Sequence, residues 1–334
     1  MSWRKLKVNP EEFNLRATLN SGQAFRWLFS EELGEWHGVI NGTLWRLCQS
    51  NESQPVFYYD DRPACKDNKT SDVPVDLTDY FRLDVDISEL LQVWRERDRR
   101  FADRSSPALL PKKSVYTVTE ACGIRLLRQD PVETLFAFIA SANNNVPRIS
   151  GLLNNLSKKF GEPLRSSRDD IVHWRFPSLD KLSGNEMETH LRELGFGYRS
   201  KFIPAAARWL LSNGGANRLY ELRLAPAEEA RQFLLNIPGI GNKVADCICL
   251  SSLDKTEIVP VDVHMLQAAR DRGLIGSNIY GLTTQTYRSV SKSLSAHWGL
   301  WAGWAQAIEF ATRIRSTGTS RKRKWKSVVG SDTD

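Results

Sequence analysis

Residues 234–246 of the chain read Leu-Leu-Asn-Ile-Pro-Gly-Ile-Gly-Asn-Lys-Val-Ala-Asp, and residues 259–264 read Val-Pro-Val-Asp-Val-His. In the first segment, a Pro-Gly-Ile-Gly turn joins two predicted helices, over residues 226–236 and 242–253. Glycine permits positive φ and the close approach of another backbone, so Gly239 and Gly241 predict a tight hairpin. The amide N–H groups that begin the second helix, together with its dipole, would suit a phosphate. An ordinary helix-turn-helix bend is the alternative.

Lys243 lies in the first turn of the second predicted helix. The positive end of a helix and burial both disfavour an ammonium group, so we expect the pKa of Lys243 to lie below its usual value of about 10.4. A lowered pKa would make the amine a nucleophile. A surface lysine without a special role is the alternative.

Asp262 follows the extended segment Val259-Pro260-Val261 and precedes a predicted helix over residues 263–272. This position predicts an N-cap, whose side chain accepts backbone hydrogen bonds. Capping alone would explain most aspartates at such a place. The apolar residues on both sides, however, predict a partly buried carboxylate, which structural needs rarely explain.

A fixed carboxylate and a reactive amine together suit one kind of chemistry. When an N-glycosidic bond breaks, C1′ of the sugar becomes cationic, and a carboxylate stabilises that charge. An amine that adds to C1′ forms a Schiff base, which acidifies the C2′ proton and allows β-elimination. Lys243 and Asp262 therefore predict a glycosylase that is also a lyase.

The composition predicts a globular chain, and its basic charge favours a polyanionic partner, although many basic proteins bind none. The net charge is +7, with 41% hydrophobic and 25% charged residues. The sequence contains no apolar run that reaches the roughly 18 residues of a membrane span, and its N-terminus has no apolar signal core. We therefore expect no membrane association and no secretion, and we expect a monomer.

The cysteines are scattered and odd in number, which favours reduced thiols inside the cell. They are Cys48, Cys65, Cys122, Cys247 and Cys249. Their spacing matches neither a structural zinc site nor a four-cysteine iron–sulfur loop. We expect no metal cofactor, apart from a loosely bound monovalent or divalent cation where the hairpin meets a phosphate.

Patterning predicts an α+β fold with three parts. In residues 1–117, the segment over 35–47 alternates between apolar and polar residues and breaks at Asn41-Gly42, which is a hairpin signal. After it we expect a strand over 55–59, a helix over 84–102 and a polar insertion over 103–117. Residues 118–315 are mainly helical. The predicted helices there begin at Pro131 or cover 147–160, 186–194, 199–213, 226–236, 242–253, 263–272, 283–295 and 299–314.

The last part, residues 316–334, is rich in Ser, Thr and Gly and contains the basic cluster Arg321-Lys322-Arg323-Lys324-Trp325-Lys326. We expect this tail to be disordered. The cluster is typical of a nuclear-import signal or a non-specific DNA-binding tail. A solvated charged tail is the alternative.

The hairpin, lysine and aspartate resemble those of the helix-hairpin-helix DNA glycosylases that carry a Gly/Pro-rich loop and an aspartate. Within that superfamily the chain is similar to the eukaryotic 8-oxoguanine DNA glycosylase/AP lyases, from about Leu15 to Arg315. The matching segments are residues 20–27 (Asn-Ser-Gly-Gln-Ala-Phe-Arg-Trp), 125–131 (Arg-Leu-Leu-Arg-Gln-Asp-Pro), 141–145 (Ser-Ala-Asn-Asn-Asn), 194–199 (Leu-Gly-Phe-Gly-Tyr-Arg), 243–249 (Lys-Val-Ala-Asp-Cys-Ile-Cys) and 301–310 (Trp-Ala-Gly-Trp-Ala-Gln-Ala-Ile-Glu-Phe). The resemblance implies an antiparallel sheet domain of the TATA-box-binding-protein type, followed by an all-α glycosylase domain.

The resemblance also implies roles for single residues. Lys243 would be the Schiff-base nucleophile and Asp262 its carboxylate partner. The damaged base would lie in a pocket formed by Gly22, Cys247, Gln306 and Phe310. There the Gly22 carbonyl would accept the N7–H of 8-oxoguanine, Gln306 would bind the Watson–Crick edge, and Cys247 and Phe310 would sandwich the ring.

DNA contacts follow by the same resemblance. Asn143 would fill the space left by the flipped base, and Arg148, Tyr198 and Arg199 would contact the opposite cytosine. His264, Gly239 and Gly241 would lie near phosphates. The implied partner is damaged double-stranded DNA, and the implied location is the nucleus, with a mitochondrial pool as a further option.

Two positions depart from the family pattern. Arg313 stands three residues after Phe310, where the family has an acidic residue, and Ser251 stands two residues after Cys249, where it has methionine. These positions leave the support of His264 and the floor of the pocket open. Two alternatives also remain: a related helix-hairpin-helix glycosylase for another damaged base, and a non-enzymatic DNA-binding protein, which would need neither Lys243 nor Asp262.

Overall fold

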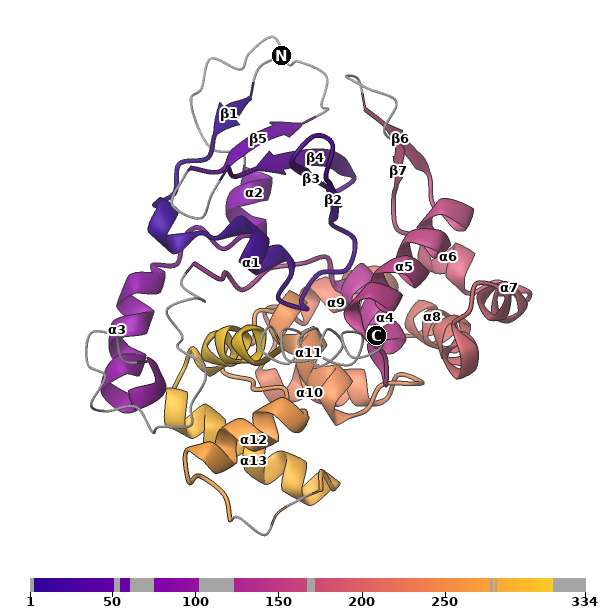
Figure 1. Cartoon of the computed structure of the whole chain (residues 1–334). Coiled ribbons are helices and arrows are strands. Elements are labelled where there is room, and N and C mark those ends of the chain that lie inside the picture. The colour runs from indigo at the N-terminus through magenta and orange to yellow at the C-terminus, as the bar shows by residue number, and fades with distance from the viewer. Residues whose placement is uncertain are drawn as a thin grey trace, which may run out of the picture.

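The computed structural model describes residues 3–50, 55–60, 75–101, 123–166, 172–276, 279 and 281–314. It has a sheet at the N-terminal end followed by helices, which confirms the predicted α+β class (Figure 1). The predicted insertion over 103–117, the tail over 316–334, Cys65 and Cys122 lie outside these residues, as does the predicted domain boundary at 117/118.

Within the described residues, five strands form one antiparallel sheet in the order β1-β5-β4-β3-β2. The strands are β1 (Arg4–Lys5), β2 (Leu28–Ser30), β3 (Glu35–Ile40), β4 (Thr43–Cys48) and β5 (Phe57–Asp60). Asn41 and Gly42 have φ of 48° and 72°, as a two-residue hairpin between β3 and β4 requires. This confirms the hairpin predicted from the sequence; the short β1 and β2 have no clear alternating pattern and were not predicted.

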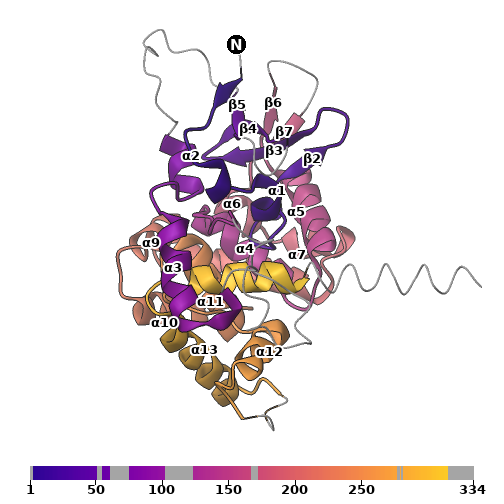
Figure 2. The same cartoon turned by 60° about the vertical axis from the view of Figure 1, so that its left-hand side comes forward.

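The helices of the first hundred residues are short except for one. They are η1 (Pro10–Glu12), α1 (Leu15–Leu19), α2 (Val75–Tyr80), α3 (Ile87–Arg97) and η2 (Arg99–Phe101). Helix α3 begins at an Asp86 N-cap and lies within the predicted helix over 84–102. Figure 2 shows α2 beside the sheet and α3 lower down, next to the later helices.

The remaining elements are mostly helices, and their bounds agree with the predicted ones to within a few residues wherever one was predicted. They are α4 (Pro131–Ser141), α5 (Val146–Phe160), β6 (Pro163–Arg165), β7 (Val172–Trp174), α6 (Leu179–Leu182), α7 (Met187–Glu193), η5 (Gly197–Lys201), α8 (Phe202–Ser212), α9 (Gly215–Glu221), α10 (Ala227–Leu235), α11 (Asn242–Ser252), α12 (Val263–Asp271), α13 (Thr284–Trp298) and a last helix over 302–314. The β6–β7 pair, α6 and α9 were not predicted.

Apolar side chains in the described part of the chain gather in three clusters. One lies under the sheet and includes Trp45 and Phe81. A second joins α4 through α11. The third joins α3 to α12, α13 and the last helix, and in it the Trp94 indole donates a hydrogen bond to the Trp298 carbonyl at 3.2 Å. Helix α3 therefore packs with the C-terminal helices, although it belongs to the first hundred residues.

Helix α11 lies between the second and third clusters. Its Val244, Ala245, Cys247, Ile248 and Cys249 pack in the second cluster, whereas Leu250 packs in the third. The last helix, yellow in Figures 1 and 2, runs beside α11. The two helices that carry four of the six predicted catalytic and base-pocket residues are thus held together at the centre of the molecule.

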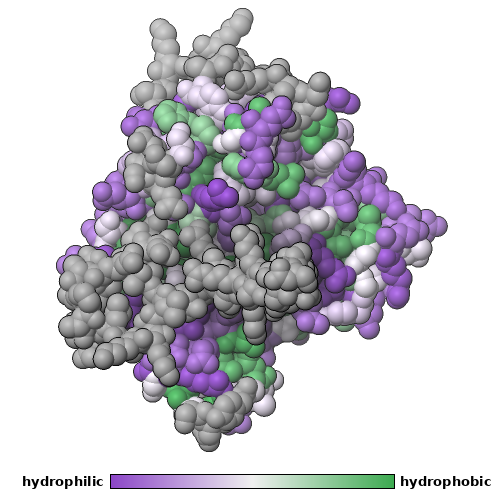
Figure 3. All heavy atoms as spheres, viewed as in Figure 1, coloured by the Kyte–Doolittle hydropathy of each residue, from purple (hydrophilic) through white to green (hydrophobic). Residues whose placement is uncertain are grey.

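The surface agrees with a chain exposed to water. In Figure 3 the visible face carries many hydrophilic residues, and hydrophobic residues appear in small separate patches. Among the described residues, no helix is long and apolar enough to span a membrane.

The contact between the last helix and α11 depends on Gly303. A Cβ there would lie 2.2 Å from Leu250 Cδ1 and 2.7 Å from the Ile258 carbonyl oxygen. We therefore expect Gly303→Ala to lower the free energy of unfolding by about 1–3 kcal/mol. Gly151→Ala is the control, because none of the described atoms outside its own helix lies within 4 Å of its Cβ position, and we expect it to raise stability by about 1 kcal/mol. Urea titrations compare the two; equal effects would contradict the packing argument.

Candidate functional site

A cavity of about 480 Å³ brings the two predicted catalytic residues and the predicted base-pocket residues together. Lys243 and Asp262 both line it. It is also lined by Gly22, Cys247, Gln306, Phe310, His264 and Ser251. These residues come from four separate parts of the sequence, namely the loop after α1, helix α11, the start of α12 and the last helix.

Lys243 is the second residue of α11, at the helix start predicted for it. Its Nζ lies 5.7 Å from the centroid of the Phe138 ring, which projects from α4. Cys247 follows one turn later on α11 and is buried. The amine therefore lies at the inner end of the cavity, between an aromatic face and a thiol.

The predicted lowering of the Lys243 pKa is wrong for the DNA-free protein. Cys247, one turn along α11, is the largest cause and raises the pKa of Lys243, burial lowers it, and the charge of Asp262 raises it further, so that the net shift is upward. Burial is in turn the largest cause of a raised pKa of the Cys247 thiol. The helix-end argument failed because it left out Cys247 on the same helix and Asp262 at the start of α12.

Asp262 caps α12, as predicted. Its Oδ1 accepts hydrogen bonds from the backbone N–H of His264 at 2.9 Å and of Met265 at 3.0 Å. The side chain is partly buried, and these bonds hold one edge of the carboxylate against the helix. The capping geometry thus fixes the carboxylate at the cavity wall.

The hairpin between α10 and α11 also has the predicted geometry. Gly239 has φ of +87°, and a Cβ there would lie 2.7 Å from Phe202 Cβ, so only glycine fits. Gly241 caps α11 in an extended conformation, is exposed, and has none of the described atoms within 4 Å of its Cβ position. The first amides of α11 therefore face open space, as binding of a phosphate would require.

A buried acid fixes the orientation of α11. Asp246 accepts hydrogen bonds from Arg231 Nε at 2.7 Å and from the Tyr287 hydroxyl at 2.5 Å. Arg231 also donates to Asn242 Oδ1 at 2.7 Å. Because α10 supplies Arg231 and α13 supplies Tyr287, the start of α11 is tied to two neighbouring helices.

Gly22 lies in a loop that Gln23 holds in place. The Gln23 amide donates to the Arg125 carbonyl at 3.1 Å and accepts from the Leu127 N–H at 3.0 Å. Gly22 has φ of +84°, and a Cβ there would lie 3.2 Å from Phe310 Cε1. The loop therefore brings the backbone of Gly22 next to Phe310, which is the close approach that a narrow slot for a flat ring needs.

Gln306 and Phe310 project from successive turns of the last helix into the same cavity. The His264 ring packs against Phe310 with a centroid distance of 5.8 Å and an interplanar angle of 74°. Ser251 is buried, and its carbonyl accepts a hydrogen bond from the Gln129 N–H at 2.9 Å. The small serine thus stands in the cavity wall, next to Leu250.

Four other predicted DNA-binding residues lie outside the lining of this cavity, in and around the 142–145 loop. Asn143 is exposed and has φ of 49°. Arg199 is buried and donates to the Asn143 carbonyl at 2.7 Å and to the Ala142 carbonyl. Tyr198 is 52% exposed, and the Arg199 guanidinium lies 4.5 Å from its ring centroid. The Arg148 guanidinium donates to the Gly195 carbonyl at 3.2 Å. Their roles toward DNA stay predictions.

Sequence and structure comparisons place the chain in a family. The model described as "8-oxoguanine DNA glycosylase, N-terminal domain" matches residues 5–135. A Saccharomyces cerevisiae protein named N-glycosylase/DNA lyase is 33% identical over 363 residues, covering 97% of this chain and 91% of the yeast protein. The chain belongs to the 8-oxoguanine DNA glycosylase family.

Other members of this 8-oxoguanine DNA glycosylase family agree. An Arabidopsis thaliana protein named N-glycosylase/DNA lyase OGG1 is 32% identical over 321 residues, covering 95% of this chain and 82% of that protein. A Clostridium acetobutylicum 8-oxoguanine glycosylase/lyase, solved with double-stranded DNA that has cytosine opposite 8-oxoguanine, matches with a TM-score of 0.74 and 25% identity over 95% of this chain and 99% of that one. The chain is therefore an enzyme of a glycosylase/lyase family within the helix-hairpin-helix superfamily.

The cysteines and acidic side chains of the described residues do not gather into a metal site. Of the cysteines in the described ranges, Cys48, Cys247 and Cys249 are free thiols. Within the same ranges, no group of three or more His, Cys, Asp or Glu side chains could hold a metal ion. The cation at the hairpin stays a prediction.

Two features of the site were not predicted. Phe138 lies within the helix predicted to begin at Pro131, and its contact with the Lys243 amine depends on the packing of α4 against α11. Gln23 was part of a matching segment, but its role as the support of Gly22 depends on bonds to residues about a hundred positions away. Neither partner could be found from local sequence.

The raised pKa of Lys243 predicts an alkaline pH profile. Only the neutral amine attacks, so the rate rises as the pH rises through the pKa of Lys243. Cys247→Ser removes the largest cause of the upward shift, so we expect the rising limb to move to lower pH. Single-turnover nicking of DNA with a preformed abasic site, followed across the neutral and alkaline range, measures this. Cys249→Ser is the control, since this thiol is not among the causes of the shift; an unmoved limb in Cys247→Ser would refute the assignment.

Proposed function

We propose that this enzyme flips 8-oxoguanine out of double-stranded DNA, where it lies opposite cytosine, excises it, and nicks the strand. The observation that carries the proposal is that Lys243, Asp262 and the predicted base-pocket residues line one cavity. A nucleophile, a carboxylate and a flat slot between Phe310 and the Cys247 side of α11 are what excision of a base with capture of its sugar requires.

The chemistry follows from the positions of these groups. Asp262, held by its two N–H bonds, stabilises the positive charge that develops on C1′ as the glycosidic bond breaks. The base leaves with the electron pair of the broken bond and takes up the proton that the Lys243 ammonium gives up. The free amine then adds to C1′, and the sugar ring opens to a Schiff base. Loss of the C2′ proton then expels the 3′ phosphate, which nicks the strand and leaves the amine free after hydrolysis.

Selection of the lesion depends on one hydrogen bond. 8-Oxoguanine carries a hydrogen on N7 that guanine lacks, and the Gly22 carbonyl is the proposed acceptor. Guanine would leave that acceptor unpaired in the slot, at a cost of about 1–3 kcal/mol. The bonds of Gln23 to Arg125 and Leu127 support this role, because they fix the loop that carries Gly22.

DNA contacts are proposed for the surface around the cavity. The exposed start of α11 at Gly241 would bind a phosphate, and Asn143, Arg148 and Tyr198 would enter the space near the flipped base and the opposite cytosine. A basic net charge of +7 supports a DNA partner. A monomer that works in the nucleus is part of the same proposal.

Borohydride trapping tests the nucleophile. With a duplex that holds 8-oxoguanine opposite cytosine, we expect the protein to form a covalent adduct that Lys243→Gln abolishes, because glutamine cannot form a Schiff base. Lys181→Gln, at an exposed position on α6, should leave the adduct unchanged. An adduct that persists in Lys243→Gln would remove this residue from its role. The same assay on duplexes that hold other damaged bases distinguishes the proposed substrate from the substrates of related glycosylases.

Gly22→Ala tests the slot. The new Cβ would lie 3.2 Å from Phe310 Cε1 at a positive φ, so we expect excision of 8-oxoguanine to fall by about 100-fold, whereas binding to undamaged DNA stays. Gly34→Ala is the matched control, since it has φ of +66° with none of the described atoms within 4 Å of its Cβ position. Single-turnover excision rates compare the two variants. An equal loss of rate in both would mean that backbone strain alone, and not the contact with Phe310, causes the effect.

A further inference from the structure

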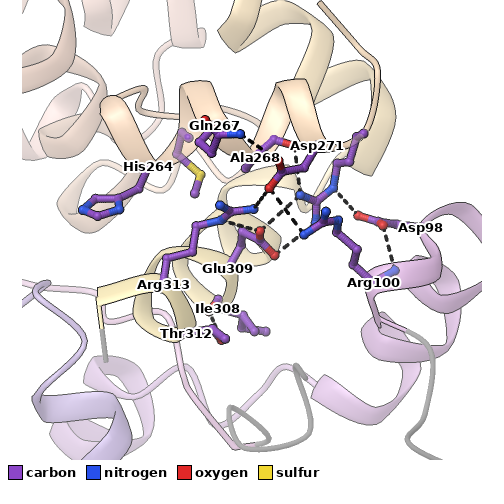
Figure 4. A network of polar contacts seen from close by, with 12 residues as sticks. Asp98, Arg100, His264, Gln267, Ala268, Asp271, Ile308, Glu309, Thr312 and Arg313 are labelled. Carbon is purple, nitrogen blue, oxygen red and sulfur yellow. Dashed lines mark hydrogen bonds and ion pairs between the residues drawn. The ribbon is translucent and has the colours of Figure 1, made fainter. Parts of the chain in front are cut away.

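Behind the base slot, six charged side chains form a continuous set of ion pairs (Figure 4). We call this set the ion-pair ring. Its members alternate in charge and come from three parts of the chain: Asp98 and Arg100 after α3, Asp271 and Arg272 at the end of α12, and Glu309 and Arg313 on the last helix. Three carboxylates face three guanidinium groups, so the ring carries no net charge and can be buried without an unpaired ion.

The centre of the ring is fully enclosed. Arg272 Nε donates to Asp98 at 2.6 Å, and its two terminal nitrogens donate to the two oxygens of Glu309 at 3.1 and 3.0 Å. The side chains of these residues are at most 5% exposed. The pKa of Glu309 is lowered: burial alone would raise it, but the charge of Arg272 and the hydrogen bonds from Arg272 and Arg313 outweigh burial. Bidentate pairs of this kind fix orientation as well as distance.

Arg313 closes the outer side of the ring. Its Nε donates to Glu309 at 2.7 Å, and its Nη2 donates to Asp271 at 2.8 Å. It therefore connects the last helix to α12 directly. In Figure 4 the Arg313 side chain runs toward Glu309 and Asp271, whereas His264 projects away from the ring. The residue that departs from the family pattern thus joins two helices and does not pair with His264.

Both of these helices line the cavity. The last helix carries Gln306 and Phe310, and α12 begins with Asp262 and His264. At the slot, the contact between them is the packing of the His264 ring on Phe310 at 5.8 Å. Apolar side chains of both helices also pack together in the third cluster, and the polar connection at the far end of α12 adds a directional contact between the same two helices.

We propose that Arg313 and Asp271 are positioning residues for base excision, which hold the base slot in register with the Asp262 carboxylate. The inference rests on the proposed function. It distinguishes two steps: excision needs the slot, whereas nicking at a site that has already lost its base needs only Lys243 and Asp262. Loss of the connection should therefore slow the first step and spare the second.

The test measures both steps in the same variants of the full chain. Arg313→Gln leaves Glu309 paired with Arg272, and Asp271→Asn leaves Arg313 paired with Glu309, so the enclosed centre of the ring is kept. We expect each variant to excise 8-oxoguanine about tenfold more slowly under single-turnover conditions, with nicking of abasic DNA within about twofold of the wild type. The double variant should be no slower than either single one, because both remove the same connection.

Two further variants keep the test falsifiable. Thr312→Ala, which removes a hydrogen bond to the Ile308 carbonyl of its own helix, is the matched control and should change neither rate. Arg313→Lys keeps a cation between Glu309 and Asp271 and should recover part of the excision rate. Equal losses of excision and nicking, or an unchanged excision rate in Arg313→Gln, would overturn the proposal. A wild-type protein that fails to nick abasic DNA would instead overturn the proposed function.

Discussion

The site depends on the buried ion pair between Asp246 and Arg231, together with the hydrogen bond from Tyr287. These contacts hold α11 against α10 and α13 at its first turns, where Lys243 begins one wall of the cavity. Asp246 is almost completely buried, and burial is the largest cause of its raised pKa, so it depends on both partners to remain in place. Removing either partner would leave a buried polar group unpaired and free the helix that carries the nucleophile.

From this fixed helix, the cavity is completed by segments that the chain brings from far away. The Gly22 loop is held through Gln23 by the strand-like segment at Arg125 and Leu127. The last helix can approach α11 closely because residue 303 is glycine. The ion-pair ring connects the same helix to α12. Gln23 and Leu250 line the cavity and also support the fold, whereas the residues of the ion-pair ring lie outside the cavity lining.

Much of this could be predicted from sequence, because the signals are local. The turn residues Asn41 and Gly42 correctly predicted the hairpin between β3 and β4, and the position of Asp262 before a predicted helix correctly predicted the N-cap of α12. Both features depend only on a few neighbouring residues. The errors came from long-range neighbours. The pKa of Lys243 depends on Asp262 at the start of another helix as well as on Cys247 of its own helix, and Arg313 pairs with Asp271 of α12 as well as with Glu309 of its own helix. No pattern within a single helix contains that information.

The pKa directions in the cavity also bear on the order of events. Cys247 and Asp262 favour the ammonium form of Lys243, so the resting amine is protonated and unreactive. In the proposed reaction, positive charge develops on the sugar beside the same Asp262 carboxylate. A cation at C1′ repels the ammonium and competes with it for that carboxylate, and both effects lower the pKa of Lys243 at the moment when attack is needed. Cleavage of the glycosidic bond and activation of the amine would therefore be coupled through one carboxylate, which explains why a raised resting pKa is compatible with a lysine nucleophile.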